Sequence, residues 1–578
     1  MVAVVLSWIY MTLVCGCIGG GVIYLLCKAA APKEERFRGG SFDSAGLMAG
    51  KFSMTQYLAA GITTVTVYVE VFSIFGRIGG PAHILMLLAA ALSGIAGRKI
   101  ILKWWIKCKK LVFSWEGFFY AGFILAVAFF TSRGNFHTDT NIYHAQMIRL
   151  YEEYGLIKGM GNLQLHFAYN SAYLAFASIF SLRWLLGQSL HTTTGFIEVI
   201  MCLYAFHGLK DFKRHRSHTA DMMRVGILFY TLVMITGSIS PATDYATMLF
   251  ALFVITEWCE NMESSRSITI YSLLSVLAVF VVTLKFSACF LVLIVLYPSV
   301  LLLREKRWRE IAVYFGCGCL ILLPFLVRNY LISGWLLYPF SGIDLFSAAW
   351  KIPKEYLLAD ADQIKVWGRC LYDVDKAGWP VTRWFSVWWE GQERYEKMLL
   401  AAALIGAGMT AVFAVKKVLS RRKLRWDMGA LMAAAFGSLM IWFFTAPFIR
   451  YGLAFLFALV MIAAGEYLSQ EKKGFYSILT GGMMFCMFVS VSPYWDHYIT
   501  DAGVFVKQNL KEPYYLWQKD YDRADEESII INGNTIYYST AGEVNSYHTF
   551  PGTCYKFMLE RSTLIGDDIK DGFKANGF

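Results

Sequence analysis

Two acidic side chains beside apolar runs are the groups of this chain best placed to do chemistry, and the first is Asp139. It lies in the segment His137-Thr-Asp-Thr-Asn-Ile-Tyr-His144, just after an apolar run that ends near Ser132. A carboxylate at the exit of a membrane helix can take a proton from a hydroxyl group while it faces a water-filled cleft, with His137, Tyr143 and His144 around it. The alternative is an N-cap, because a run with helical apolar spacing follows Asp139. The two interpretations are compatible, and both remain open.

The second acidic group is Asp244, in the turn Ser-Ile-Ser-Pro-Ala-Thr-Asp-Tyr between two apolar runs. Pro241 can open the helix that follows, so Asp244 is either a capping residue or a second acid on the same face as Asp139. Glu70 and Glu198 lie well inside apolar runs, where we expect each to form a structural pair with a basic residue.

Three cations are candidates for holding a phosphate group. Arg328, with Asn329 beside it, ends one apolar run, and Arg450 lies in Ala-Pro-Phe-Ile-Arg-Tyr-Gly between two others. Arginine presents a planar, permanently charged fork to phosphate oxygens, whereas the alternative is an arginine that only reaches toward the membrane interface. Lys285 lies between two apolar runs, where a cation is costly unless it is paired or solvated.

The composition indicates which kind of protein must position these groups. The chain has 578 residues, of which 57% are hydrophobic and only 16% are charged. Soluble globular proteins carry about 25% charged residues, so the composition excludes a soluble enzyme, a disordered chain and a fibrous protein. It predicts an all-α polytopic membrane protein, and the net charge of +11 then reflects loop residues rather than a nucleic-acid partner.

A membrane-spanning helix needs about 20 mostly apolar residues. About fourteen runs qualify, namely 2–27, 55–75, 81–97, 116–132, 192–209, 223–239, 242–258, 267–283, 286–303, 310–326, 397–415, 427–445, 449–466 and 474–492.

Basic residues collect in loops that stay in the cytoplasm. With fourteen spans, every strongly basic connection falls on one side, and both termini are expected on the extracytoplasmic side. The predicted regions are helices in 1–132, an outer loop with the candidate catalytic acid in 133–190, helices in 191–327, a long outer loop in 328–396, helices in 397–492, and an outer domain in 493–578.

Two of these regions carry further expectations. The apolar segment 168–187 is interpreted as an interfacial or re-entrant helix, because a crossing there would move a basic loop outside. The tail is expected to be a small mixed α/β domain with strands around the Asn-Gly pair at 532–533, docked on the segment 328–396. Cys370 and Cys554 lie in outer segments, either as a disulfide or as two free thiols.

Several segments together resemble a family of uncharacterised bacterial polytopic membrane proteins. They are Asp-Thr-Asn-Ile-Tyr-His-Ala-Gln (139–146), Ile-Ser-Pro-Ala-Thr-Asp-Tyr (239–245), Thr-Leu-Lys-Phe-Ser (283–287), Arg-Asn-Tyr-Leu-Ile-Ser-Gly-Trp-Leu-Leu-Tyr-Pro (328–339), Ala-Pro-Phe-Ile-Arg-Tyr-Gly (446–452) and Phe-Pro-Gly-Thr-Cys-Tyr (550–555). The matches occur in order over about three quarters of the chain. That family is similar to the glycosyltransferase C (GT-C) superfamily of integral membrane enzymes.

The resemblance implies a role for each matched residue. Asp139 would be the general base and Asp244 a second acid that orients the acceptor or binds a metal, while Lys285, Arg328 and Arg450 would hold the phosphate of a lipid carrier. The other substrate-binding residues would be His137, Tyr143, His144, Asn162, His166, Asn329 and Tyr451. The chain departs from the family where an arginine is replaced by His166, and where Phe448 stands in place of a carboxylate.

The resemblance therefore implies a glycosyltransferase in the bacterial plasma membrane. It would move a sugar from a polyprenyl-phosphate donor to a cell-envelope glycan or lipid-linked acceptor on the extracytoplasmic face. No nucleotide cofactor and no nucleic acid are expected, whereas a divalent cation stays open. The alternatives are a transporter or flippase of lipid-linked saccharides, and a non-catalytic envelope assembly protein.

Overall fold

The chain is mostly helical. The computed structural model describes residues 1–576 except 31–49, 51, 213–217, 420–424, 470–473, 495–499, 502, 504–505, 507–509 and 512. Within these residues nine helices are long and apolar enough to cross a membrane, and a bent pair at 80–112 would make ten. This composition of elements fits a multi-pass membrane protein with a small C-terminal sheet region.

The N-terminal region is a group of long helices followed by a set of short ones. The long helices are α1 (Val2–Ala30), α4 (Met54–Phe75), α5 (Gly80–Ala96), α6 (Arg98–Val112) and α7 (Trp115–Arg133). The short ones are η1 (Thr140–His144), α8 (Ala145–Glu153), α9 (Met160–Leu163), η2 (Leu165–Ala168), α10 (Ala172–Phe180) and α11 (Arg183–Leu186). Helix α4 begins with a capping box in which Ser53 and Gln56 each accept a backbone N–H of the other, which satisfies amides that a helix start leaves free.

The central and C-terminal helices form the rest of the bundle. The central ones are α12 (Thr193–Leu209), α13 (Thr219–Met234), η4 (Ile235–Gly237), α14 (Thr243–Glu263), α15 (Ile268–Leu284), η5 (Phe286–Val295), α16 (Leu296–Arg304) and α17 (Trp308–Ser333). After α18 (Lys354–Gly368), η6 (Val374–Lys376) and α19 (Val381–Gly391) come α20 (Arg394–Leu419), α21 (Trp426–Thr445), α22 (Ile449–Ser469) and α23 (Phe475–Val491). Helices α14 and α22 are buried along almost their whole length and form the core of the bundle.

Each of the fourteen predicted apolar runs is helical, but the number of spans stays a prediction. Helices α12, α15 and α23 have 17 residues each, or about 26 Å at 1.5 Å per residue, which is slightly less than a hydrocarbon core of about 30 Å.

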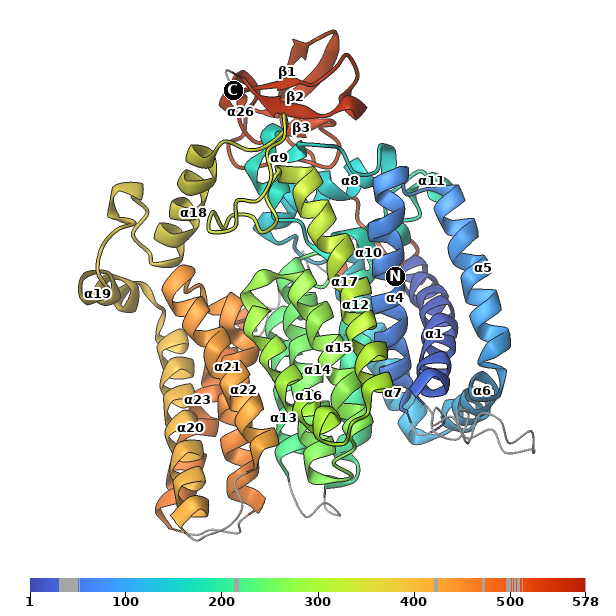
Figure 1. Ribbon diagram of the computed structural model, residues 1–578, viewed down its shortest axis with the longest axis vertical. Helices are drawn as coiled ribbons and strands as arrows, with labels where there is room; N and C mark the ends of the chain where they lie inside the picture. The colour runs from blue at the N-terminus through green and yellow to red at the C-terminus, as the bar shows by residue number, and fades with distance from the viewer. Residues whose placement is uncertain are drawn as a thin grey trace.

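The segments predicted to share the outer side lie at one end of the molecule. Figure 1 shows strands β1 (Glu526–Ile531), β2 (Asn534–Ser539) and β3 (Gly552–Thr553) at this end with α8, α9 and α18, whereas the basic helix α6 lies at the opposite end. The basic helix α6 and the segments predicted to be extracytoplasmic therefore lie at opposite ends of the described structure.

The C-terminal region contains the predicted hairpin. Strands β1 and β2 pair antiparallel, with Ile531 opposite Asn534, and the turn residues Asn532 and Gly533 both have positive φ, as a two-residue hairpin turn requires. The chain continues through α26 (Lys556–Glu560), β4 (Ser562–Leu564), η8 (Ile569–Asp571) and β5 (Phe573–Ala575).

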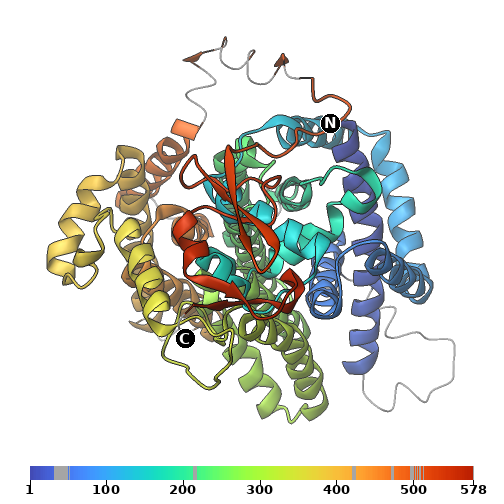
Figure 2. The same ribbon diagram turned by 90° about the horizontal axis from the view of Figure 1, so that it is seen from above.

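This region docks mainly on the first outer loop rather than on segment 328–396 as expected. Arg149 donates to the carbonyl oxygens of Tyr547 and His548 at 2.7 and 3.1 Å, and the amide of Asn545 donates to Asn141. Figure 2 shows the C-terminal strands lying over the helices of that loop. Backbone groups of the tail make most of these contacts. The pattern of apolar residues in the tail could therefore not predict them.

The segment 168–187 forms two short helices instead of one long one. Helix α10 has nine residues and all of them are buried, so at about 14 Å it is too short to cross a membrane by itself. Ser171 caps it and also donates to the carbonyl oxygen of Leu284. Cys370 and Cys554 are free thiols, so the disulfide alternative is not realised.

Candidate functional site

Asp139 lies at the start of the π-helix η1 and is paired with Arg450. It occupies the N-cap position, but its side chain makes no capping hydrogen bond. Instead Arg450 Nη2 approaches Asp139 Oδ2 at 3.2 Å. Because Arg450 is the second residue of the buried helix α22, the core of the bundle fixes where this guanidinium emerges.

Asp244 is held by two cations. It is the second residue of α14 and, like Asp139, does not cap its helix. Lys285 donates to Asp244 Oδ1, and Arg450 Nε lies 3.6 Å from Asp244 Oδ2. Lys285 is the extended residue between α15 and η5, so the break between these helices turns its ammonium group toward α14. The ring of Tyr451 lies 3.5 Å below that ammonium group.

The five residues Asp139, Asp244, Lys285, Arg450 and His137 form what we call the ionic cluster. It is accessible, since the side chains of Asp139, Lys285 and Arg450 retain exposed fractions of 16%, 20% and 36%. The capping interpretation of both aspartates is wrong, because their carboxylates bind cations instead of helix amides.

His137 makes two contacts that a neutral imidazole cannot both accept. Its Nδ1 accepts from the backbone amide of Asp139 at 3.1 Å, while its Nε2 lies 2.8 Å from Arg450 Nη1. A neutral histidine has one acceptor nitrogen, so the tautomer decides which of the two contacts it accepts. Arginine carries only donors, so the contact with Arg450 is a hydrogen bond in the tautomer whose Nε2 is unprotonated.

The charges of the cluster are balanced. Burial alone would raise the pKa of Asp139, but the guanidinium of Arg450 outweighs it and holds that pKa well below its usual range. Burial lowers the pKa of His137 and lowers that of His144 to about 3, so both imidazoles are neutral near pH 7. Two carboxylates therefore face two cations.

This balance bears on the open question of a metal ion. Ligand atoms of His137, Asp139 and Asp244 lie within 4.8 Å of one another, a spacing that can hold a cation. Lys285 and Arg450 already neutralise both carboxylates, so a divalent ion would have to displace one of them. The donor set fits a metal only after that rearrangement.

Four further predicted residues, Tyr143, His144, Asn162 and His166, lie in the first outer loop. The ring of Tyr143 stacks on that of His166, with centroids 5.5 Å apart, and His144 is buried with Nδ1 3.4 Å from Thr140. Asn162 instead donates to the carbonyl oxygen of Trp350 at 2.9 Å. Asn162 therefore links the first outer loop to segment 328–396, and none of its described hydrogen bonds reaches the cluster.

The structure does not bring Arg328 and Asn329 to the cluster. Arg328 is fully buried, with Nε 3.8 Å from Glu70, and it donates to Ser73 and, at 3.3 Å, to Asn170. Asn329 accepts a hydrogen bond from Asn170 at 2.9 Å. The structure does not support the expected contact of Arg328 with a phosphate. Its guanidinium points into the bundle, where Glu70 and neutral side chains surround it. The predicted pairing of Glu70 is confirmed, whereas Glu198 accepts from Ser238 and has no basic partner among the described contacts.

Sequence reasoning missed a further buried carboxylate near this end of the molecule. Asp360, on α18, is 4% exposed and accepts hydrogen bonds from Tyr169 at 2.7 Å and from Tyr338 at 3.0 Å. No motif marked it, because its two partners lie 22 and 191 residues away in the chain.

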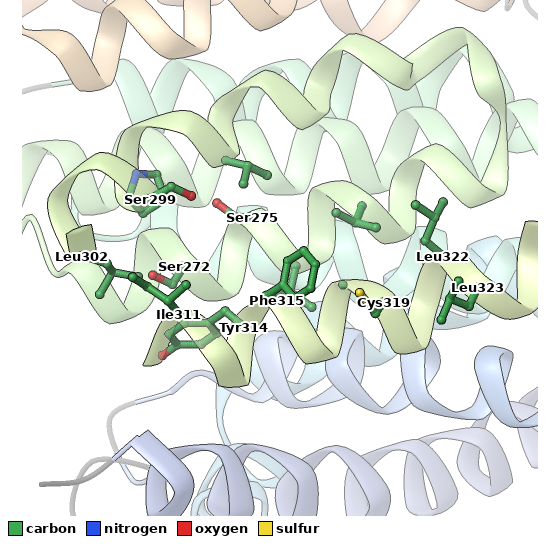
Figure 3. A pocket seen from close by; sticks show the side chains of 15 residues that line it. Ser272, Ser275, Ser299, Leu302, Ile311, Tyr314, Phe315, Cys319, Leu322 and Leu323 are labelled. Carbon is green, nitrogen blue, oxygen red and sulfur yellow. The ribbon is translucent and has the colours of Figure 1, made fainter. Parts of the chain in front are cut away.

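Two apolar grooves lie among the helices below the cluster. One, of about 300 Å³, lies between α15, α16 and α17, and its lining residues include Ser272, Ser275, Phe315 and Leu322 (Figure 3). The other, of about 370 Å³, lies between α1, α4, α15 and α17. Helix α15 lines both grooves with residues between Ile270 and Val279, and it ends at Leu284, next to Lys285.

Comparison with known proteins gives one match. The model of a family described as Domain of unknown function (DUF8201) matches residues 1–457, a range that contains the whole ionic cluster and stops before the C-terminal region. No curated protein and no solved structure matches the chain.

Proposed function

Because this chain belongs to the DUF8201 family, whose description assigns no activity, we propose its function from the site itself: an integral membrane glycosyltransferase. It moves a sugar from a polyprenyl-phosphate donor to a cell-envelope glycan or lipid-linked acceptor on the outer face. The finer proposal for the fold is a GT-C-like arrangement of about fourteen spans in the plasma membrane, with both termini on the extracytoplasmic side.

One observation carries the proposal. Side chains from four separate elements, at Asp139, Asp244, Lys285 and Arg450, converge at one accessible end of the bundle. Such a site offers a carboxylate to an incoming hydroxyl and fixed cations to a departing phosphate.

The grooves along α15 supply the second part of the argument. A polyprenyl tail is apolar and extended, and a tail that lies along α15 brings its phosphate to Lys285 at the end of that helix. The phosphate oxygens then meet the guanidinium of Arg450, whose planar fork of donors suits them.

The reaction follows from this arrangement. Arg450 turns from Asp139 to the phosphate, and the pKa of Asp139 rises once its partner has left. Asp139 then takes the proton of the acceptor hydroxyl, the oxygen attacks the anomeric carbon from the opposite face, and the bond to the phosphate oxygen breaks. The electron pair stays on the polyprenyl phosphate, where Arg450 and Lys285 stabilise the developing charge.

The experiment measures transfer of labelled sugar from polyprenyl phosphate to envelope glycan in membranes that contain the full chain. We expect Asp139→Asn to abolish transfer, and Asp362→Asn, an exposed aspartate paired with Lys365 on α18, to keep the wild-type rate. Equal transfer by wild type and Asp139→Asn refutes the assignment. Flipping of the lipid in liposomes without any acceptor would instead indicate a transporter.

A further inference from the structure

A row of aromatic rings leads from the ionic cluster to Asp360. The ring of Tyr143, which follows Asp139 by four residues, stacks on His166 at 5.5 Å and 19°. The ring of Tyr169 meets Tyr143 edge-on at 5.9 Å and His166 edge-on at 5.5 Å. Tyr338 lies 5.8 Å beyond Tyr169. The rings belong to the first outer loop and to the segment that follows α17.

The carboxylate at the end of this row is anchored through one oxygen only. Tyr169 and Tyr338 both donate to Asp360 Oδ2, and Oδ1 accepts neither bond. A carboxylate held in this way keeps one oxygen for the hydroxyl of a ligand. His166 and Tyr169 are only partly buried, whereas Tyr143 and Asp360 are buried.

The chemistry of the row matches one class of ligand. A sugar ring presents apolar C–H faces with hydroxyl groups around its edge, so it suits aromatic faces bordered by a hydrogen-bonding carboxylate. The group attached to a phosphate held by Arg450 and Lys285 must lie next to that phosphate, and Tyr143 belongs to the π-helix η1 that Asp139 begins.

We propose that Tyr143, His166, Tyr169 and Asp360 form the subsite for the donor sugar, with Tyr338 positioning Asp360. This proposal rests on the proposed function, and it adds the recognition of a glycosyl unit by a second group of residues. Segment 328–396 thus contributes to specificity through α18, although none of its residues belongs to the ionic cluster.

The test compares two lipids on the full chain in lipid nanodiscs. One is polyprenyl phosphate, and the other is polyprenyl phosphate that carries a single glucose, galactose or mannose. We expect at least one sugar-bearing lipid to bind wild type about tenfold more tightly than the bare phosphate, a difference expected from one or two hydrogen bonds and ring contacts. Tyr169→Leu and Asp360→Asn should lose this advantage and bind bare polyprenyl phosphate as wild type does.

Two further variants keep the result interpretable. Tyr169→Phe retains the ring and should keep more of the advantage than Tyr169→Leu. Tyr372→Leu is the matched control, because Tyr372 is 63% exposed on the same outer segment and contacts Trp367 instead of the row. Asp360→Asn is nearly isosteric, so it reports on the subsite even where Tyr169→Leu fails to fold.

The outcomes separate the two proposals. Equal binding of bare and sugar-bearing lipids by wild type, or an advantage that survives in both Asp360→Asn and Tyr169→Leu, overturns the subsite while phosphate binding is intact. If wild type binds neither lipid, the subsite falls together with the proposed function.

Discussion

The ionic cluster and the pair Arg328–Glu70 each join an arginine to a carboxylate. They differ in the solvent exposure of these side chains and in the groups that surround them. The side chains of Arg328 and Glu70 are 0% and 1% exposed, and Arg328 also lies over the ring of Tyr151 at 4.8 Å. Arg450 is 36% exposed, reaches two carboxylates and lies 2.8 Å from His137 Nε2. The inner arginine is surrounded by protein, whereas the outer one has capacity for a ligand.

The difference shows that an arginine at the end of an apolar helix is not by itself evidence of a phosphate site. A buried pair is costly to break, because the remaining charge has no solvent. An accessible cluster with two cations can exchange one of its internal bonds for a bond to an incoming anion at much lower cost. The comparison therefore predicts opposite phenotypes for the two arginines.

The largest expected effect is on catalysis. Arg450→Gln should lower the rate of sugar transfer by about 10²–10³, the usual cost of removing one donor to a developing negative charge, and should lower the unfolding temperature less than Arg328→Met does. Arg394→Gln is the matched control, because Arg394 is also near the start of a bundle helix and is exposed. A wild-type transfer rate in Arg450→Gln would remove the cluster from the mechanism.

The next effect is on stability. Arg328→Met should lower the free energy of unfolding by about 3–5 kcal/mol, because it leaves Glu70 buried without its partner. The double variant Glu70→Gln/Arg328→Met should recover part of this loss. Thermal unfolding in detergent measures both, and the transfer rate per folded molecule should stay near wild type. A stable Arg328→Met protein that cannot transfer sugar would reverse the comparison.

A smaller effect concerns pH. The pKa of Asp139 is lowered in the folded state, so the pair with Arg450 contributes stability that is full above the ordinary carboxyl value of about 3.9 and is lost as the pH falls toward the folded pKa. The difference in unfolding temperature between wild type and Arg450→Gln should be constant from about pH 5 to 8 and shrink below about pH 4. If the difference in unfolding temperature instead changed between pH 6 and 7, the titrating group would be an imidazole and not Asp139.

The smallest effect concerns the thiols at the outer end. Cys370 and Cys554 are free, and Cys554 donates to the carbonyl oxygen of Ile142 at 3.3 Å. A reducing agent should therefore leave the unfolding temperature unchanged. A fall on reduction would show that a disulfide, in addition to hydrogen bonds, holds the outer segments together.

The helices and the hairpin could be predicted from sequence because their signals are local. Apolar runs give helices, and the Asn532–Gly533 pair gives the turn between β1 and β2. Asp139, Asp244, Lys285 and Arg450 were also predictable as polar groups that the topology brings to one end.

The environments of other groups depend on distant segments, and sequence reasoning failed there. Arg328 and Arg450 both lie at an end of an apolar run. Only the fold shows that Arg328 points toward Glu70 and Arg450 toward Asp139. Asp360 meets Tyr169 across 191 residues, and no local pattern specifies such a contact. The docking of the tail depends on backbone carbonyls, which every residue possesses.

The most direct test of the central claim is an experimental structure of the chain in lipid nanodiscs with polyprenyl phosphate bound. We expect the phosphate oxygens within about 3 Å of Arg450 and Lys285, with Arg450 turned away from Asp139 and Arg328 unchanged beside Glu70. A phosphate bound elsewhere, with the pair of Asp139 and Arg450 intact, would contradict the account.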